Sequence, residues 1–294
     1  MTILITGATG KIAQHVIISL LGDGHPVRAM VRSGAQEPGL RRQGAETVIA
    51  SFEDPDSLWA AAKGAETLLL LTPPHQHAAA WASAAIAAAK QAGIRRIVRI
   101  SAILAGSDGP SDNNRQHGRT DDELRHAGIA SVILRPHFFM QNLLADVASL
   151  RSDGVIYAAA GDARLGMIDT RDIADVATKA LLDPSWDGNT YDLTGPDSIS
   201  FHDIARQLSE LVGREIRYVP MSPDRLAQSI RDVGLDEWYA QGYHDYLRAY
   251  SEGWGDFTTD AVAQISGKPA RSFKAFASSF RPSRQVRSPR QGAR

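Results

Sequence analysis

A glycine loop that begins at residue 7 constrains the fold of this chain more than any other feature. Residues 2–6 form a short apolar run that is typical of a buried strand. Gly7-Ala8-Thr9-Gly10-Lys11-Ile12-Ala13 follows directly and opens a segment with helical periodicity. A strand, a glycine loop and a helix in this order form the phosphate-binding turn of dinucleotide-binding folds. The sequence therefore predicts a nucleotide site here, with a plain strand–helix turn as the alternative.

The residue types in this loop suit a phosphate. Gly7 permits a tight turn, and Gly10 lets the backbone approach a pyrophosphate closely. The N-terminus of the helix adds free N–H groups and the positive end of a dipole. Ala13 replaces the third glycine of the usual pattern, whose task is close helix–strand packing. The expected pyrophosphate contacts are Gly7, Thr9, Gly10, Lys11 and Ile12.

Strand-like and helix-like segments alternate through the first half of the chain. This order predicts an α/β fold with a doubly wound parallel Rossmann sheet, because parallel strands need crossover helices between them. Residues 67–71 are apolar throughout, as expected of a strand that helices cover on both faces. The predicted strands are Ile3–Thr6, Val27–Val31, Thr47–Ala50, Thr67–Leu71, Ile97–Ser101 and Ser131–Leu134, and the predicted helices are Ala13–Leu21, Asp56–Lys63, Ala78–Gln91 and Asp121–His126.

The pattern loosens after about residue 150. We expect residues 1–150 to form the nucleotide-binding domain, with residues 167–185 packing back on it. Residues 151–280 should form mainly a smaller C-terminal α/β lobe for the substrate. Residues 281–294 hold five arginines and no acid, which is typical of a disordered, solvated tail, with nucleic-acid binding as the alternative. Predicted elements of this half are helices at Thr170–Leu182, Ser200–Val212, Pro223–Gly234 and Asp236–Trp254 and strands at Thr190–Leu193 and Glu215–Val219.

Composition excludes several classes of protein. A formal net charge of −1 gives no overall field to attract nucleic acid or a membrane, so a small neutral molecule is the expected partner. The absence of cysteine rules out disulfides, iron–sulfur clusters and thiol nucleophiles. Without a signal-peptide pattern or a long apolar run, the expected location is the cytoplasm. No metal is expected, since His75 and His77 have no carboxylate cluster beside them, and the oligomeric state stays open.

Arg32, at the end of the second strand, bears on the choice of cofactor. An acidic residue there would hold the ribose hydroxyls of NAD, whereas an arginine suits the 2′-phosphate of NADP. Arg28 and Lys11 can add positive charge. We therefore expect NADP(H) to be preferred, and NAD(H) is the alternative if Arg32 is merely solvated.

Further motifs follow in a definite order along the chain. Besides Gly7–Ala13 and Val27–Arg32, they are Leu134-Arg135-Pro136, Asn142, Asp169–Ala174 and Leu193-Thr194-Gly195-Pro196. Together they resemble the NmrA-like branch of the atypical short-chain dehydrogenase/reductase family, which includes NAD(P)H:quinone oxidoreductase-like proteins. The resemblance extends to about residue 280. It implies a Rossmann domain, a small C-terminal lobe and a substrate cleft between them.

The resemblance also implies cofactor contacts by position. Thr72 and Pro73 would border the ribose. The nicotinamide would lie near Ser101, Arg135 and Pro136. Members of the family often carry Gly-Asp after the third strand, where the acid meets adenine. This chain has Ala50-Ser51 there, so contact with adenine passes to the backbone of Phe52.

The catalytic pair of conventional short-chain dehydrogenases is missing. Those enzymes use Tyr-x-x-x-Lys before the sixth strand, where Tyr protonates a carbonyl oxygen and Lys lowers its pKa. This chain carries His117-Gly118-Arg119-Thr120-Asp121 instead, and Ser101 keeps the place of the usual serine. His117 and Asp121 share a helix face if the helix reaches back that far, and Asp121 would then favour a charged imidazole. We expect His117, Ser101 and Asp121 to be catalytic, with structural hydrogen bonding as the alternative for His117.

Aromatic residues recur at three- and four-residue steps between Tyr239 and Phe257. This spacing places them on one side of a helix, which either packs on the body of the protein or walls a flat pocket. Tyr239 and Tyr243 are the expected substrate contacts. Phe138 and Phe139, after the sixth strand, would form the opposite wall.

Quinone reduction makes a stabilised phenolate and needs no strong proton donor, unlike the reduction of a simple ketone. The leading hypothesis is therefore an NAD(P)H-dependent oxidoreductase that acts on a quinone or a polycyclic aromatic substrate. Two alternatives stay open. One is a non-catalytic NADP-binding redox sensor, and the other is a tailoring enzyme for aromatic natural products that uses the same cleft for oxygenation.

Overall fold

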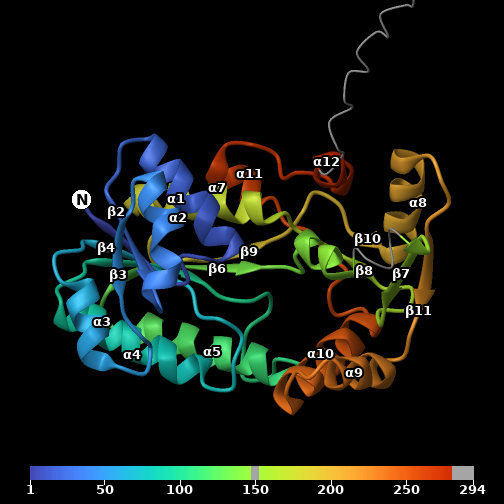
Figure 1. Cartoon of the computed structure of the whole chain (residues 1–294), viewed down its shortest axis with the longest axis horizontal. Helices are drawn as coiled ribbons and strands as arrows, with labels where there is room; N and C mark the ends of the chain where they lie inside the picture. Colours follow the sequence, from blue (N-terminus) through green and yellow to red (C-terminus); the bar gives the residue numbers. More distant parts are fainter. Residues whose placement is uncertain (147–151, 280–294) are drawn as a thin grey trace, which may run out of the picture.

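A seven-stranded parallel sheet forms the middle layer of the larger of two lobes (Figure 1). The computed structural model describes residues 1–146 and 152–279. The strand order β3-β2-β1-β4-β5-β6-β9 contains the order 3-2-1-4-5-6 of dinucleotide-binding folds and confirms the predicted doubly wound sheet. The strands are β1 (Ile3–Ile5), β2 (Val27–Val31), β3 (Glu46–Ile49), β4 (Thr67–Leu70), β5 (Arg96–Ile100), β6 (Ala130–Pro136) and β9 (Thr190–Leu193).

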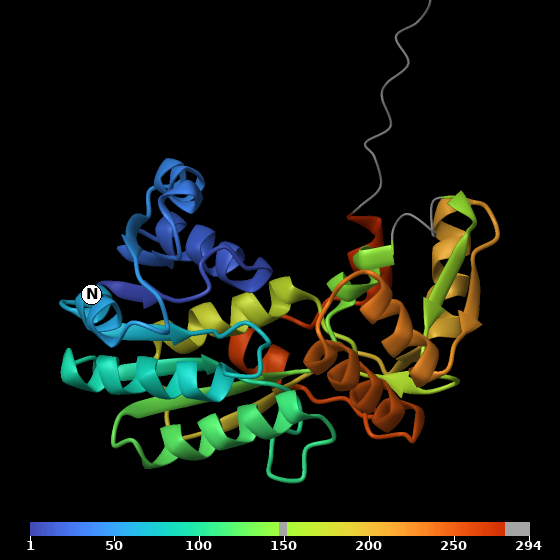
Figure 2. The same ribbon diagram turned by 60° about the horizontal axis from the view of Figure 1, so that its bottom comes forward.

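Helices cover both faces of this sheet (Figures 1 and 2). One face carries α1 (Lys11–Gly22), α2 (Glu37–Gln43), α7 (Thr170–Leu182) and α11 (Ala261–Ser266), and the other carries α3 (Pro55–Ala62), α4 (Ala78–Gln91) and α5 (Asp112–His126). Successive residues of β1 enter opposite cores, with Ile3 and Ile5 under α1 and Leu4 under α3 and α4. Burial on both sides explains the continuous apolar runs in the sequence.

The sheet also takes in segments from the second half of the chain. α7 packs against α1, and α11 packs against α7. β9 pairs with β6 at the edge of the sheet, where Leu193 lies opposite Pro136. Asp169 begins α7, because its side chain accepts a hydrogen bond from the backbone N–H of Arg171 at 2.9 Å. The chain thus leaves the sheet after β6 and returns for α7 and β9, so the smaller lobe is discontinuous in sequence.

The smaller lobe combines two-stranded sheets with helices around a third core. The strands pair as β7 (Val155–Ala158) with β11 (Arg217–Pro220), parallel, and β8 (Arg164–Leu165) with β10 (Ile199–Ser200), antiparallel. The helices are α8 (Phe201–Val212), α9 (Pro223–Asp232), α10 (Glu237–Ser251) and α12 (Phe273–Ser278). The sequence predicted α8, α9, α10 and β11 but not β7, and the two-residue strands β8 and β10 are too short to show a period.

α5 contains the predicted helical segment Asp121–His126 and begins well before it, at Asp112. Ser111 caps it, because its Oγ accepts a hydrogen bond from the backbone N–H of Asn114 at 3.3 Å. The first turns carry polar residues even on their buried side, where Asn114 and Gln116 lie, so they show no apolar periodicity. The longer helix places His117 and Asp121 one turn apart, which was the condition for them to share a face.

Short 3₁₀ turns connect several of these elements, namely η1 (Gly34–Gln36), η2 (Met140–Asp146) and η3 (Pro184–Trp186). The expected domain boundary near residue 150 and the arginine-rich segment 281–294 lie outside the described residues. Within the described ranges, no helix has both the length and the apolar character that crossing a membrane requires.

Gly118 lets α5 approach the loop that follows β5. A Cβ atom added at Gly118 would lie 2.7 Å from the backbone of Gly106. We expect Gly118→Ala to lower the free energy of unfolding by about 1–3 kcal/mol, because one of two packed backbone segments must move. Gly39→Ala on α2 is the control, since a Cβ there meets nothing within 4 Å. Chemical denaturation measures both variants, and equal stability would contradict the close approach.

Candidate active site

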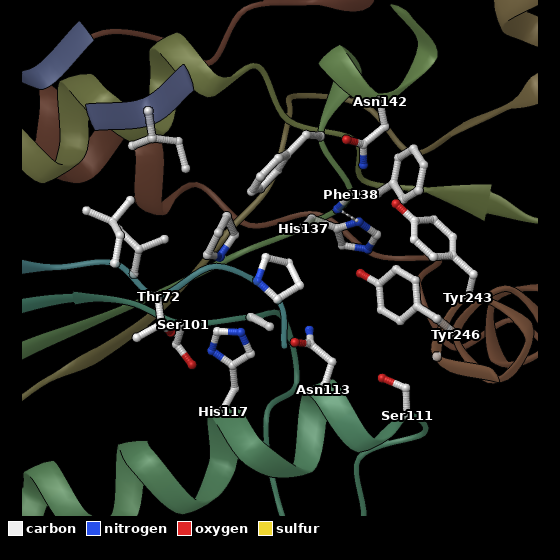
Figure 3. A pocket seen from close by; sticks show the side chains of 18 of the residues that line it. Thr72, Ser101, Ser111, Asn113, His117, His137, Phe138, Asn142, Tyr243 and Tyr246 are labelled. Atoms are coloured by element: carbon white, nitrogen blue, oxygen red, sulfur yellow. Dashed lines mark hydrogen bonds between the residues drawn. The ribbon is translucent and has the colours of Figure 1, made fainter. Parts of the chain in front are cut away.

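A cavity of about 420 Å³ opens at the carboxyl edge of the sheet, beside the smaller lobe. Parallel strands all end at this edge, so the loops after β1, β4, β5 and β6 converge there. These loops line the cavity together with α5 and α10 (Figure 3). The residues that the sequence singled out can therefore be followed around its walls.

The loop after β1 is shaped for an anion. Gly7 has a φ of +60°, in the left-handed region that favours glycine. The backbone N–H of Gly10 donates to the Gly7 carbonyl at 2.8 Å and closes the turn. α1 then begins with no side-chain cap and no acid in its first turn, which leaves its N–H groups available to a ligand. Gly10, Lys11 and Ile12 line the cavity, whereas Thr9 is exposed outside the lining.

Thr72, in the loop after β4, presents an unsatisfied hydroxyl. It lines the cavity, and its Oγ1 is buried with no hydrogen-bond partner among the described residues. Buried polar atoms are nearly always paired, so this one fits a contact with a bound molecule. Pro73 is exposed outside the lining, and Pro74 takes its place there. Together with the open N-terminus of α1, the orphaned hydroxyl fits a dinucleotide bound along this edge.

Arg28, near the start of β2, and Arg32, directly after its end, have different surroundings. Arg32 is exposed, and its side chain makes no hydrogen bond or ion pair with a described residue; only its backbone N–H is bonded. Arg28 lies near the start of β2 and donates to Glu46 and to two carbonyls at the end of α3. The start of a parallel strand is the end remote from the cavity, so the expectation that Arg28 adds charge to the cofactor site does not hold.

Phe52 belongs to an aromatic cluster at the ends of β3 and β4. Its ring stacks on Trp81 of α4 at 6.1 Å between centroids, and Trp81 stacks on His75 at 4.3 Å. The sequence indicated only the backbone of Phe52 as a contact. The cluster escaped prediction because its rings come from three separate segments that the sheet brings together.

A buried carboxylate lies next to the polar wall of the cavity. Asp121 has no exposed surface, and its Oδ2 accepts hydrogen bonds from Ser101 Oγ and from Arg135 Nε, both at 2.9 Å. Arg99 of β5 is also buried, and its Nε lies 3.5 Å from Oδ1 of Asp121. Of these four residues, only Ser101 lines the cavity. Asp121 and Arg135 are thus held away from a ligand, and they fix the position of Ser101.

His117 lines the cavity, but its ionisation differs from the prediction. Its Nδ1 lies 3.0 Å from Nη2 of Arg99, while the carboxylate of Asp121 faces Ser101 and the arginines. Burial first, and then the charges of Arg99 and Arg135, hold the pKa of His117 well below its ordinary value. The expectation that Asp121 favours a charged imidazole is therefore wrong, and His117 is neutral at physiological pH.

His137, which the sequence pattern did not indicate, is part of the cavity wall. Its Nδ1 accepts a hydrogen bond from the backbone N–H of Phe138 at 2.7 Å, and its Nε2 donates to the Gly255 carbonyl at 3.0 Å. Burial lowers the pKa of His137 to about 4. Its ring stacks on Tyr250, and a Cβ at Gly255 would lie 2.2 Å from that tyrosine. With both ring nitrogens occupied, His137 shapes the site rather than reacting in it.

The aromatic side of α10 is divided between the lobe core and the cavity. Tyr250 is fully buried in the core, and its hydroxyl donates to that of Tyr246 at 2.6 Å. Burial raises the pKa of Tyr246, so its phenol stays protonated. The aromatic residues that line the cavity are Tyr239, Tyr243 and Tyr246 with Trp238 from α10, and Phe138 and Phe139 from the end of β6 (Figure 3).

Two hydrogen bonds tie α10 to the nucleotide-binding domain. Nε1 of Trp238 donates to Oδ2 of Asp112 at 2.9 Å, and the hydroxyl of Tyr239 donates to the Pro74 carbonyl at 3.3 Å. Burial raises the pKa of Asp112, but the hydrogen bonds from Trp238 and Gln116 lower it by more, so the pKa lies below its ordinary value. Asp112 is therefore an anionic acceptor, and the aromatic wall is fixed across the cavity.

Asn113 is a further polar residue that the sequence did not single out. It lies one turn before His117 and lines the cavity, and its Oδ1 is buried without a hydrogen-bond partner among the described residues. The sequence could not indicate this role, because Asn113 lies in a polar segment and nothing in the neighbouring residues distinguishes it.

Across residues 1–146 and 152–279, no group of three or more His, Asp or Glu side chains could hold a metal ion.

Comparisons with known proteins identify the family. Residues 7–184 match the NAD(P)H-binding family. The chain is 32% identical to the NAD(P)H azoreductase of Xenophilus azovorans over 275 residues, which cover 94% of this chain and 96% of that protein. The crystal structure of the NADPH-dependent quinone oxidoreductase QOR2 of Escherichia coli with NADPH has a TM-score of 0.86 at 28% identity and covers 94% of this chain and 99% of that one.

The Citrobacter sp. triphenylmethane reductase, solved with NADP(H), shares the fold with a TM-score of 0.84 at 24% identity, over 94% of this chain and 99% of that one. The family match takes in the phosphate loop, α5 and α7, and the two closer relatives extend over nearly the whole chain. The chain belongs to the NAD(P)H-binding family and is an NAD(P)H-dependent oxidoreductase, similar over nearly its whole length to an azoreductase and a quinone oxidoreductase.

Proposed function

We propose that the protein transfers hydride from NADPH to a quinone or another extended aromatic acceptor. The observation that carries this proposal is the continuity of one cavity, with Gly10 and Lys11 at the phosphate loop and Tyr243 and Tyr246 at the aromatic wall. A cofactor seated on α1 and a flat ring seated against α10 would share this space. The relatives named as azoreductase and quinone oxidoreductase support the same class of acceptor.

Each part of the cofactor has matching residues along the edge of the sheet. The N-terminus of α1 would hold the pyrophosphate, and the exposed guanidinium of Arg32 would pair with a 2′-phosphate. The orphaned hydroxyl of Thr72 would bond a ribose, with Ser101 and Pro136 beside the nicotinamide. The ring of Phe52 and its stacked partners offer a surface for adenine. When bound, NADPH supplies the hydride, and these residues orient it toward the cavity.

The polar groups of the cavity favour an acceptor whose reduced form is a stabilised anion. Reduction of a simple ketone makes a basic alkoxide that needs an acid beside it. His117 is neutral, and burial raises the pKa of both Tyr243 and Tyr246, which makes their phenols weaker acids. Hydride transfer to a quinone instead leaves a phenolate, which can take its proton from water.

The space beside Ser101 also favours an enzyme over a cofactor sensor, because a sensor needs no pocket for a second molecule.

Mixing the protein with NADPH and a panel of naphthoquinones, an azo dye and a simple ketone tests the proposal. NADPH should be oxidised with the quinones, saturably in both substrates, as followed by the absorbance of the reduced nicotinamide. Gly10→Val should lower kcat/KM at least about tenfold, because a Cβ there lies 3.1 Å from the Gly7 carbonyl and would disturb the turn that the proposal assigns to the pyrophosphate. Gly22→Val, at the other end of α1, is the control. Binding of NADPH without turnover of any acceptor would indicate a sensor instead.

Arg32→Ala tests the preference for NADP(H). The KM for NADPH should rise about tenfold or more, because a charge-assisted hydrogen bond to the 2′-phosphate is lost, while the KM for NADH should hardly change. Arg42→Ala, an exposed arginine on α2, should leave both constants unchanged. Steady-state kinetics with each cofactor give the comparison. Equal KM values for NADPH in the two variants would refute the role of Arg32.

Asp112→Ala tests the tie between α10 and the nucleotide-binding domain. Loss of the bond from Trp238 should loosen the aromatic wall and raise the KM for the quinone several-fold, with the KM for NADPH unchanged. Asp122→Ala, on the exposed side of the same helix, removes only a surface ion pair with Arg125 and serves as the control. A parallel rise in both KM values would point to general damage of α5 rather than to the wall.

A further inference from the structure

The partner of His117 determines where its proton lies. A guanidinium carries only N–H donors, so at 3.0 Å from Nη2 of Arg99 the Nδ1 atom of His117 must accept the hydrogen bond. A neutral imidazole has one donor nitrogen and one acceptor nitrogen. With Nδ1 as the acceptor, the proton of the neutral ring resides on Nε2.

Arg99 is enclosed in this position, with its Nε and Nη1 atoms buried and without hydrogen-bond partners among the described residues. Its side chain is 1% exposed and lies within β5, where Nε approaches Asp121 at 3.5 Å. Burial lowers the pKa of Arg99 to about 10, which still leaves the guanidinium charged at physiological pH. Because Arg99 is enclosed and charged, its bond to His117 persists across the pH range in which a free histidine would titrate.

The other charged groups near His117 come from each element packed around it. Arg135 on β6 adds a second cation, and Asp121, one turn later on α5, turns its oxygens toward Ser101, Arg99 and Arg135. Glu123 on α5 acts electrostatically on Arg99, and Asp192 on β9 interacts with Arg135 and Asp121; burial raises the pKa of Asp192. From α10, across the cavity, the facing groups are the protonated phenols of Tyr243 and Tyr246. Cations therefore dominate the surroundings of the ring and oppose a further positive charge on it.

The free side of His117 is turned to the cavity. The residue is part of the cavity lining, and its side chain rises from α5 in the same direction as that of Asn113, one turn earlier (Figure 3). Nε2 makes no hydrogen bond with any residue that the structure describes, whereas Nδ1 is occupied by Arg99. The Nε2–H group is thus the one available for a bound molecule.

We infer that Arg99 is a positioning residue that keeps His117 in its neutral Nε2–H form, so that His117 donates a hydrogen bond to the acceptor oxygen without giving up its proton. The inference rests on the proposed hydride transfer and deepens it. Hydride carries one hydrogen and two electrons to the quinone, and negative charge develops on a carbonyl oxygen. The Nε2–H bond stabilises that charge. Water then protonates the hydroquinone anion, since loss of the Nε2 proton would leave an unfavourable imidazolate.

The ¹⁵N chemical shifts of the His117 ring test the tautomer directly. In the wild-type protein, Nε2 should be protonated and Nδ1 unprotonated, with no titration between about pH 5 and 8. Arg99→Met should give mixed tautomers and should raise the pKa of His117 only part of the way toward its ordinary value, because burial and the charge of Arg135 remain. Arg95→Met, an exposed arginine before β5, should leave the His117 signals unchanged. A protonated Nδ1, or titration of wild-type His117 in this range, overturns the inference.

Two substitutions of His117 test its role in catalysis. A glutamine can place an N–H group near the position of Nε2 but has no titrating ring, so His117→Gln should keep kcat within about threefold of the wild type. His117→Phe should lower kcat about a hundredfold with little change in KM, because one donor to the developing charge is lost. The kcat of the wild type should be flat between about pH 5 and 8. Equal losses in the two variants, or a kcat that follows an ionisation near pH 6.5, would show that His117 does not act as a fixed donor.

The two measurements separate this inference from the proposed function. The NMR experiment needs no turnover, so it can confirm the Nε2–H form even if no quinone is reduced. In that case the proposed function fails while the assignment of the tautomer holds. If quinones are reduced but Nδ1 carries the proton, the proposed function holds and the role of Arg99 fails. Should Arg99→Met not fold, the wild-type spectrum and the glutamine and phenylalanine variants still decide the question.

Discussion

Parallel strands that all end at one edge of a sheet are the constraint on which this site depends. Helices bury both faces of the sheet, so only its carboxyl edge can present backbone and polar side chains to a ligand. The loops after β1, β4, β5 and β6 meet there, and the return of β9 beside β6 extends the same edge. The phosphate loop, the orphaned hydroxyl of Thr72 and the neutral His117 are neighbours for this reason alone.

A single buried carboxylate organises the polar side of that edge. Asp121 joins α5 to β5 and β6 through Arg99 and Arg135, and it also holds Ser101. Removing one partner from such a cluster leaves an uncompensated buried charge, at a cost of about 3–5 kcal/mol. The cluster therefore acts as a rigid support, and it explains why His117 meets cations rather than an anion. Its consequence is a site built from fixed hydrogen-bond donors, without the Tyr and Lys pair of conventional short-chain dehydrogenases.

Much of the fold could be predicted because its signals are local. The glycine loop between a strand and a helix and the alternation of apolar segments each lie within a few residues, and the structure has these elements within a few residues of the predicted bounds. The start of α5 was missed because its buried residues, Asn114 and Gln116, are polar and leave no apolar period. The two-residue strands β8 and β10 were missed because they depend on pairing across 34 positions of sequence, Leu165 with Ile199.

The sequence by itself determined the nucleotide-binding fold, the phosphate loop and the aromatic residues of α10, since residue type and spacing specify local geometry and burial. Only the tertiary structure decided which of these groups touch the cavity and in what ionisation state. In the sequence, Arg99 is only a polar residue within a strand. Its contact with His117, 18 positions away, nevertheless determines which ring nitrogen of the imidazole carries the proton. Trp238 is joined to Asp112 across 126 positions. Electrostatics and hydrogen bonding act through space, so they depend on distances that no local pattern encodes.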